Sequence, residues 1–261
     1  MIPKALFDAV KRAGDAILAV YHSDDFGIEI KGDASPVTKA DKHAHDILVC
    51  ALQRLNMGPV LSEEDADIAW SVRKDWTQYW LVDPLDGTKE FIKRNNEFTV
   101  NVALIRDHVP VLGIVYAPVM DLWYFGEQGE GAFKKTGNED PIAIRPAVIP
   151  SGAKPWRVVG SSSHSSQDFD QFMSGFSNAE LVRVGSSLKL CMVADGSADL
   201  YPRLIPTCEW DTAAAQAVVE AAGAKVINWE TKKPLRYNTK AVLLNPYFIV
   251  CADISDVWWV A

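Results

Sequence analysis

The 261-residue sequence lacks the features that mark membrane, secreted and nucleic-acid-binding proteins. No apolar stretch approaches the ~20 residues of a membrane-spanning helix, and charged residues interrupt the apolar pattern of residues 1–23, unlike that of a signal peptide. No run of Lys or Arg is present, and the formal charge of −8 disfavours a nucleic-acid or anionic-lipid surface. We therefore expect a cytoplasmic globular protein, with peripheral association on the inner membrane face left open.

Cysteine is also scarce. The four cysteines form no CxxC pair and stand at no zinc-finger spacing from a histidine: Cys50, Cys191, Cys208 and Cys251. We expect reduced, mostly buried thiols. The chain has no internal repeat, and its only weak boundary is the polar stretch 135–155, so we expect one two-lobed domain over residues 1–261, with lobes of about 1–140 and 141–261. Monomer or homodimer is left undecided.

Hydrophobic periodicity predicts a layered α/β fold. Apolar residues at spacings of three and four predict helices over 2–21, after Thr38, and over 210–223 with Asp211 at its start. In the second half, helices near 166–175 and 187–195 alternate with strands. Strands or hairpins are expected at 27–31, 59–64, 78–83, 98–105, 111–119, 122–135, 156–164, 181–187, 198–203, 225–229 and 248–252. The predicted architecture is an αβαβα sandwich, with mixed sheets between helix layers.

Two aspartates follow the apolar strand that opens the segment WLVDPLDGTKEF, residues 80–91. Pro84 biases Asp83 toward an extended backbone, and the following glycine permits a tight turn. Asp83 and Asp86 can therefore converge beyond the strand, with the Leu85 carbonyl directed into the same space. Clustered hard oxygen ligands of this kind suit Mg²⁺.

The next two residues, Gly87 and Thr88, offer backbone N–H groups that suit a phosphate oxygen. An acidic turn capped by its own side chains is the simpler explanation of this segment taken alone. A calcium-binding EF-hand loop is excluded, because the twelfth position from Asp83 is Arg94 rather than Glu.

Three more acidic residues occupy comparable positions. Glu63 and Glu64 follow a predicted strand, where a solvated loop would explain them, and Asp211 opens a predicted helix, where capping would explain it. Open α/β sheets gather their ligands at strand ends and helix starts. Acidic residues thus occur at two predicted strand ends, 59–64 and 78–83, and at one predicted helix start, near residue 211. Their occurrence at all three positions favours a shared metal centre over three unrelated surface features.

Six sequence blocks, in this order, resemble the inositol monophosphatase superfamily: SPVTKAD, VLSEED, YWLVDPLDGTKEFIKRNNEFTVNVALI, GSSLK, LYPR and WDTAAAQAVVEAAGA. The resemblance extends from about residue 2 to about residue 250 and is strongest toward the bacterial 3'(2'),5'-bisphosphate nucleotidase branch. It implies the αβαβα sandwich of inositol monophosphatase and fructose-1,6-bisphosphatase. It also implies lithium sensitivity and a role in sulfur metabolism.

The resemblance also implies residue roles. Two or three Mg²⁺ ions would be held by Glu63, Asp83, the Leu85 carbonyl, Asp86 and Asp211. Asp41 and Thr88 would orient the attacking water, which the metal activates, with Glu64 as a helper. Nucleotide contacts would come from His164, Ser186, Lys189 and Arg203, and the phosphate would also lie against Glu63, Leu85, Asp86, Gly87, Thr88 and Asp211.

The function expected from the resemblance is Mg²⁺-dependent hydrolysis of the 3'-phosphate of adenosine 3',5'-bisphosphate to AMP and phosphate, with phosphoadenosine phosphosulfate as a further substrate. An inositol monophosphatase or another sugar-phosphate phosphatase is the alternative, and a non-catalytic metal-dependent anion-binding module is a remote one. A haloacid-dehalogenase-type phosphatase is disfavoured, because two residues rather than one separate Asp83 from Asp86. The Trp258–Trp259 tail carries no recognised motif.

Overall fold

The computed structural model describes residues 2–32, 36–151, 154–161 and 166–253. The predicted nucleotide contact His164 and the Trp258–Trp259 tail lie outside the described residues. Within the described ranges, no helix combines the length and apolar character required to span a bilayer.

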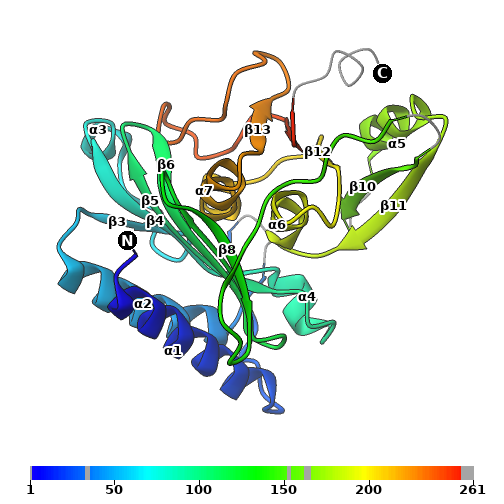
Figure 1. Ribbon diagram of the computed structural model, residues 1–261. Helices are drawn as coiled ribbons and strands as arrows, with labels where there is room; N and C mark the ends of the chain where they lie inside the picture. The colour runs from blue at the N-terminus through cyan, green and yellow to red at the C-terminus, as the bar shows by residue number, and fades with distance from the viewer. Residues whose placement is uncertain (1, 33–35, 152–153, 162–165, 254–261) are drawn as a thin grey trace.

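Two long amphipathic helices, α1 (Lys4–Tyr21) and α2 (Lys39–Leu55), form the first layer. They lie side by side against one face of a large sheet (Figure 1). Thr38 caps α2, as predicted, because its hydroxyl accepts the N–H of Ala40 while Asp41 accepts the N–H of Thr38. Between the two helices, β1 (Glu29–Ile30) and β2 (Pro36–Val37) form a short antiparallel pair.

The large sheet has the strand order β3-β4-β5-β6-β7-β8-β9. The β3–β4 pair is parallel and the other pairs are antiparallel. Short helices α3 (Trp70–Arg73) and α4 (Thr88–Ile92) connect β3 to β4 and β4 to β5. The strands are β3 (Val60–Ser62), β4 (Gln78–Asp86), β5 (Thr99–Arg106), β6 (Val109–Ala117), β7 (Leu122–Glu127), β8 (Gly131–Thr136) and β9 (Ile142–Ala143).

The smaller sheet has the strand order β11-β10-β12-β14-β13. Its strand β10 pairs in parallel with β11 and β12, whereas β14 pairs antiparallel with β12 and β13. Helix α5 (Gln167–Ser174) covers its outer face, and its strands are β10 (Trp156–Ser161), β11 (Ala179–Val184), β12 (Leu200–Arg203), β13 (Lys225–Asn228) and β14 (Phe248–Cys251).

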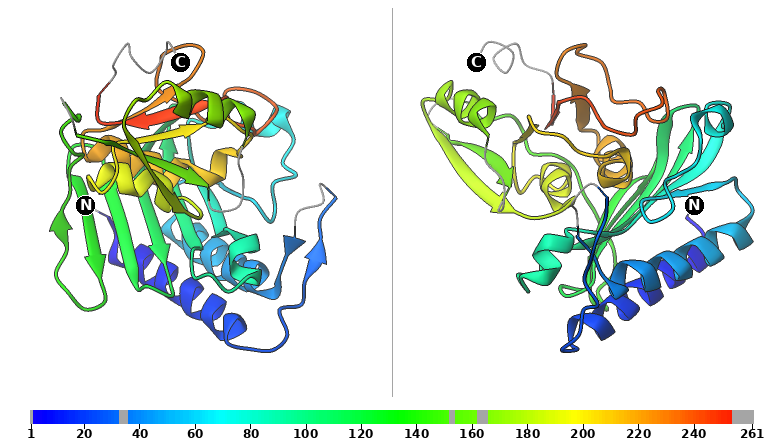
Figure 2. Two further views of the ribbon diagram at one scale, coloured as in Figure 1. Left: turned by 90° about the vertical axis from the view of Figure 1, so that its right-hand side faces the viewer. Right: turned by 180° about the vertical axis from the view of Figure 1, so that it is seen from behind.

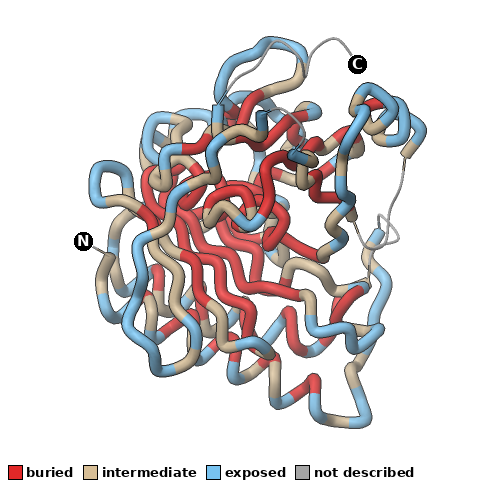
Figure 3. The backbone as a smooth tube through the Cα atoms, turned by 45° about the vertical axis from the view of Figure 1, so that its right-hand side comes forward, coloured by how far each residue is buried: buried red, intermediate tan, exposed pale blue. Residues whose placement is uncertain are grey.

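Helices α6 (Leu188–Ala194) and α7 (Ala213–Ala221) fill the layer between the two sheets (Figure 2). Figure 3 shows α7 and the central strands of the large sheet as the most continuous buried region. Tyr79 from the large sheet, Val218 from α7 and Phe248 from the smaller sheet share one apolar cluster. The layers therefore follow the predicted order αβαβα.

The structure corrects several predicted boundaries. The predicted helix over 210–223 begins only at Ala213, and Asp211 instead ends a 3-10 turn over Glu209–Asp211. Its side chain accepts the N–H of Cys208 at 2.9 Å, which holds the chain in this tighter turn. Strand β4 continues beyond the predicted end at Asp83 as far as Asp86, with an irregular register against β5.

Candidate metal and phosphate site

Three carboxylates meet where β3, β4 and the turn before α7 come together. Glu63 directly follows β3, and its N–H donates to the carbonyl of Val82 at 3.0 Å, so the parallel pairing aligns it with Asp83 on β4. Asp211 approaches from the turn before α7. One ligand oxygen from each of Glu63, Asp83 and Asp211 lies within 4.8 Å of the others. The structure thus gathers three of the predicted metal-ligating residues.

The remaining two predicted metal ligands lie on the next residues of β4. Asp86 accepts the N–H of Ser187 at 2.5 Å, and it lies close enough to raise the pKa of both Asp83 and Asp211. The Leu85 carbonyl oxygen lies 3.3 Å from the Thr88 hydroxyl oxygen. Asp86 is outside the tight group of three.

The electrostatics of this cluster favour a cation. Burial raises the pKa of Asp83, and the neighbouring Glu63, Asp86 and Asp211 raise it further. Burial raises the pKa of Asp211 to about 8, with additional contributions from Asp86 and Glu63. Oxygen ligands that repel one another at such short range suit a hard divalent cation such as Mg²⁺, which neutralises them. The residues present therefore fit the metal that the sequence predicts.

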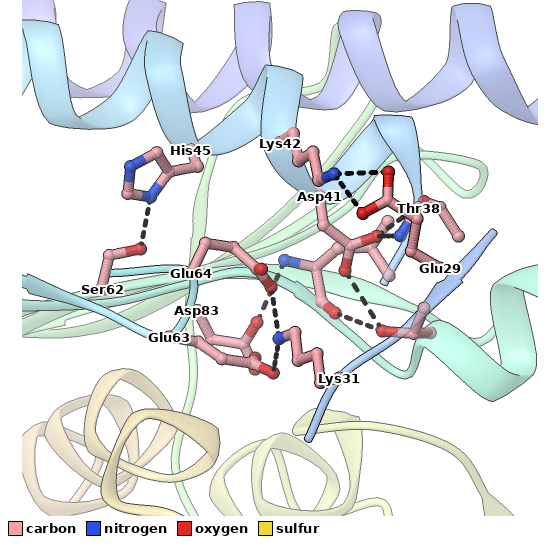
Figure 4. A network of polar contacts seen from close by, with 12 residues as sticks. Glu29, Lys31, Thr38, Asp41, Lys42, His45, Ser62, Glu63, Glu64 and Asp83 are labelled. Carbon is pink, nitrogen blue, oxygen red and sulfur yellow. Dashed lines mark hydrogen bonds and ion pairs between the residues drawn. The ribbon is translucent and has the colours of Figure 1, made fainter. Parts of the chain in front are cut away.

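Lys31 supplies a positive charge to this site, and sequence reasoning did not find it. Its ammonium group donates to Glu63 at 2.8 Å and to Glu64 at 2.7 Å, as Figure 4 shows. Burial lowers the pKa of Lys31, but the two carboxylates outweigh burial and raise it overall. The lysine comes from the turn after β1, which lies 32 residues before Glu63, and no local pattern indicates the contact.

Asp41 and Thr88 lie together beside the cluster, as predicted for residues that act on one water. The Thr88 hydroxyl lies 3.2 Å from Asp41 Oδ1. Asp41 Oδ2 accepts the N–H and the hydroxyl of Thr38, both labelled in Figure 4. Burial raises the pKa of Asp41 to about 6, although the hydrogen bonds from Thr38 oppose this effect. Glu64 also contributes to the raised pKa of Asp41.

Gly87 makes the turn between Asp86, at the end of β4, and Thr88, at the start of α4. Its φ of 92° is a conformation that side chains disfavour, and an added Cβ would lie 3.0 Å from the carbonyl oxygen of Glu97. The prediction that a glycine permits the tight turn is therefore confirmed.

A small polar cavity of about 50 Å³ adjoins the carboxylates. Ser186, Lys189 and Arg203 line it together with Asp86 and Asp211. Among the described residues, the buried Ser186 Oγ and Arg203 Nε have no hydrogen-bond partner. The Lys189 ammonium donates to the Ser186 carbonyl at 2.6 Å and lies 5.8 Å from the centroid of the Tyr201 ring. Donors without partners beside an acidic cluster suit an anion that binds next to a metal cation held by the carboxylates.

The chain belongs to the inositol monophosphatase family, whose sequence profile matches residues 2–257. The 3'(2'),5'-bisphosphate nucleotidase CysQ of Escherichia coli (strain K12) is 47% identical over 242 residues, which cover 92% of this chain and 95% of that protein. The CysQ of Haemophilus influenzae is 35% identical over 243 residues, covering 92% of this chain and 89% of that protein.

Solved structures agree with this assignment. The crystal structure of CysQ from Bacteroides thetaiotaomicron has a TM-score of 0.84 and 41% identity, covering 96% of this chain and 97% of that chain. An IMPase from Thermotoga maritima, at 22% identity, has a TM-score of 0.74 and covers 94% of this chain and 89% of that chain. The predicted fold class and family are therefore confirmed.

Proposed function

We propose that the protein is a Mg²⁺-dependent 3'(2'),5'-bisphosphate nucleotidase that converts adenosine 3',5'-bisphosphate to AMP and phosphate, with phosphoadenosine phosphosulfate as a further substrate. The names and identities of the CysQ relatives support this substrate class. The observation that carries the proposal is the cavity in which Ser186, Lys189 and Arg203 adjoin the acidic cluster. A substrate with two phosphates needs both a metal site and a second cationic pocket.

Two or three Mg²⁺ ions would be held by Glu63, Asp83, the Leu85 carbonyl, Asp86 and Asp211. When bound, Mg²⁺ supplies Lewis acidity and neutralises charge on the phosphate during hydrolysis. The scissile phosphate would also lie against Glu63, Leu85, Asp86 and Asp211, and the N–H groups of Gly87 and Thr88 would donate to its oxygens.

Asp41 and Thr88 would hold and move the proton of the attacking water. A threonine hydroxyl has one proton, so when Thr88 donates it to Asp41, its oxygen accepts a hydrogen bond from the water. Asp41 can receive the proton released in the reaction through Thr88, and its pKa of about 6 suits a base that works near neutral pH. Glu64 would assist from the neighbouring position, where it holds Lys31.

The second phosphate of the nucleotide would pair with Lys189 and Arg203, and the Ser186 hydroxyl would donate to it. These donors supply the local positive charge that a chain with a formal charge of −8 needs in order to bind an anion. His164 is proposed as a further nucleotide contact from its sequence position.

The test is phosphate release from adenosine 3',5'-bisphosphate and from inositol 1-phosphate, with Mg²⁺ and with a chelator. We expect Mg²⁺-dependent release from the nucleotide, strongly preferred over inositol 1-phosphate and lost in Asp83→Asn. The exposed Asp75→Asn is the matched control and should retain activity. Preference for inositol 1-phosphate would reject the substrate, and binding without release from either compound would indicate a non-catalytic anion-binding module.

We also propose that the protein functions in the cytoplasm. None of the four cysteines forms a disulfide, as suits a reducing compartment; Cys191 and Cys251 are buried, Cys208 is half-buried and Cys50 is exposed. Detection of the protein in a periplasmic rather than a cytoplasmic fraction would reject this proposal.

A further inference from the structure

A buried hydrogen-bond chain joins the large sheet to the turn that lines the phosphate cavity. The hydroxyls of Thr99 and Ser187 lie 2.8 Å apart, and Ser187 Oγ lies 2.8 Å from Asn101 Oδ1. Thr99, Asn101 and Ser187 are each at most 2% exposed. Each hydroxyl has one proton, so when Thr99 donates to Ser187, Ser187 donates to the amide oxygen of Asn101. In the opposite arrangement Thr99 donates to that oxygen over 3.4 Å, so the shorter contact favours the first.

The pairing of β4 with β5 explains why this chain lies at the site. Thr99 is the cross-strand partner of Asp86, and Asn101 is the cross-strand partner of Asp83. Side chains of directly paired residues lie on the same face of a sheet. The chain therefore extends from the strand beside the metal-ligating residues to Ser187, which is 86 residues further along the sequence than Asn101.

Ser187 makes two separate contacts. Its backbone N–H donates to Asp86 at 2.5 Å, and its hydroxyl joins Thr99 and Asn101. Replacing Ser187 by alanine would remove the second contact and leave the first. The two ties of this turn to the large sheet can thus be separated experimentally.

The neighbouring residue shows why the turn needs such ties. Ser186 has a φ of 50°, a left-handed conformation that is unfavourable for a residue with a side chain. A conformation of this kind persists only where the surrounding contacts enforce it. The Lys189 ammonium holds the Ser186 carbonyl on one side, and Ser187 is anchored on the other. The anchors thus keep Ser186 Oγ and Lys189 at the cavity.

Asn101 shows that this anchoring has a cost. Its Nδ2 is buried and has no hydrogen-bond partner among the described residues. A buried donor without a partner disfavours folding, and an apolar side chain at this position would avoid the penalty. The presence of asparagine at this position is therefore best explained by its amide oxygen, which accepts the hydrogen bond from Ser187.

We propose that the Ser187 hydroxyl, held by Thr99 and Asn101, is a positioning and specificity-determining element. It fixes the conformation of the turn that places Ser186 and Lys189 where they bind the second, non-scissile phosphate of the substrate. This inference rests on the proposed nucleotidase function. Ser187 acts through Ser186 and Lys189, and its hydroxyl does not hold the scissile phosphate. Its removal should therefore weaken recognition of the second phosphate more than it weakens hydrolysis of a monophosphate.

The test compares kcat/KM for adenosine 3',5'-bisphosphate with that for adenosine 3'-monophosphate in the full-length enzyme with saturating Mg²⁺. We expect Ser187→Ala to lower the ratio of the two values about tenfold, chiefly through KM for the bisphosphate. Thr99→Val, which removes one hydroxyl with little change of volume, should lower the ratio in the same direction. Ser187→Thr retains the hydroxyl and should restore part of the ratio. The control Ser174→Ala, on the exposed side of α5, should leave the ratio unchanged.

An unchanged ratio in both Ser187→Ala and Thr99→Val would overturn the inference. An equal loss on both substrates would also overturn it, because this outcome indicates a general structural role. If the wild-type enzyme itself does not prefer the bisphosphate, the nucleotidase proposal fails first and the inference fails with it. Because this last outcome is seen before any variant is made, the two failures are distinguishable.

Discussion

Two aspartates cap local structure and also belong to the proposed site. Asp41 uses Oδ2 to cap α2 at Thr38, and its Oδ1 faces Thr88. Asp211 caps the turn at Cys208 and also belongs to the group of three carboxylates. Capping and site chemistry were competing explanations of Asp211 in the sequence. A carboxylate has two oxygen atoms, so the oxygen that caps leaves the other for the proposed site.

At the residue scale, Asp41→Asn should lower kcat about 100-fold, because a positioned general base contributes roughly 10²–10⁴ to the rate. Asparagine still accepts hydrogen bonds from Thr38 but cannot take up a proton at this position. Steady-state kinetics at saturating Mg²⁺ measure the effect. The exposed Asp46→Asn on the same helix is the control. Retention of wild-type kcat in Asp41→Asn would remove Asp41 from the proposed mechanism.

Lys31→Gln should affect the metal-free protein in particular. The ammonium group offsets the charges of Glu63 and Glu64, and it is only partly buried, so its loss should reduce the free energy of unfolding by about 1–2 kcal/mol in chelator. Mg²⁺ should bind several-fold more tightly, because no cation competes for Glu63.

Denaturant unfolding and calorimetric Mg²⁺ titration measure the two effects of Lys31→Gln. Lys42→Gln, whose exposed partner is Glu29, is the control and should change neither quantity appreciably. Weaker Mg²⁺ binding in Lys31→Gln would show that the lysine assists the metal rather than opposing it.

At the scale of elements, the position of Asp211 depends on the close packing of α7 against the large sheet. A Cβ added to Gly113 on β6 would lie 2.1 Å from the carbonyl oxygen of Ala214, in the first turn of α7. Only glycine allows the strand and the helix backbone to approach this closely. Gly113, which sets the distance between strand and helix, is thus remote in sequence from Asp211, whose position depends on that distance.

Gly113→Ala should therefore reduce the free energy of unfolding by about 2–3 kcal/mol, in the range for overpacked cores. The displaced helix should also weaken Mg²⁺ binding, because α7 follows Asp211 directly. Denaturant unfolding and Mg²⁺ titration test both effects. Gly32→Ala has open space around the added Cβ and is the control. Wild-type stability in Gly113→Ala would mean that the helix can shift without cost.

For the whole molecule, sequence patterns predicted the elements better than the contacts between them. The periodicity of α1 and α2 and the apolar runs of β5 and β6 are local, and these elements form as expected. The contacts of Lys31 with Glu63 and of Ser187 with Asp86 join residues 32 and 101 positions apart. Such contacts depend on packing of the layers, which no local pattern encodes. The family resemblance supplied the ligand set, but it did not indicate Lys31, Thr99 or Asn101.

The acidic cluster should also make the stability of the whole molecule depend on pH in a way that Mg²⁺ removes. Burial and neighbouring carboxylates raise the pKa of Asp211 from 3.8 to about 8 in the folded, metal-free protein. Between about pH 4 and pH 8, the folded state therefore holds a proton that the unfolded chain has released. Folding takes up protons in this range, so the metal-free protein should lose stability as the pH rises.

Thermal unfolding from pH 5 to pH 8, in chelator and in excess Mg²⁺, measures this dependence. Burial raises the pKa of Glu209 to about 7, but Glu209 is not one of the proposed metal ligands and contributes to both curves. Asp195, whose pKa is lowered, is ionised in both the folded and the unfolded state over this range and contributes no slope. The gap in Tm between the two curves therefore reports the cluster, and it should widen by on the order of 5–10 °C toward pH 8. In Asp211→Asn this widening should become smaller, with the remainder coming from the buried Asp83. Parallel curves for the wild-type protein would mean that the carboxylates do not bind Mg²⁺ as a group.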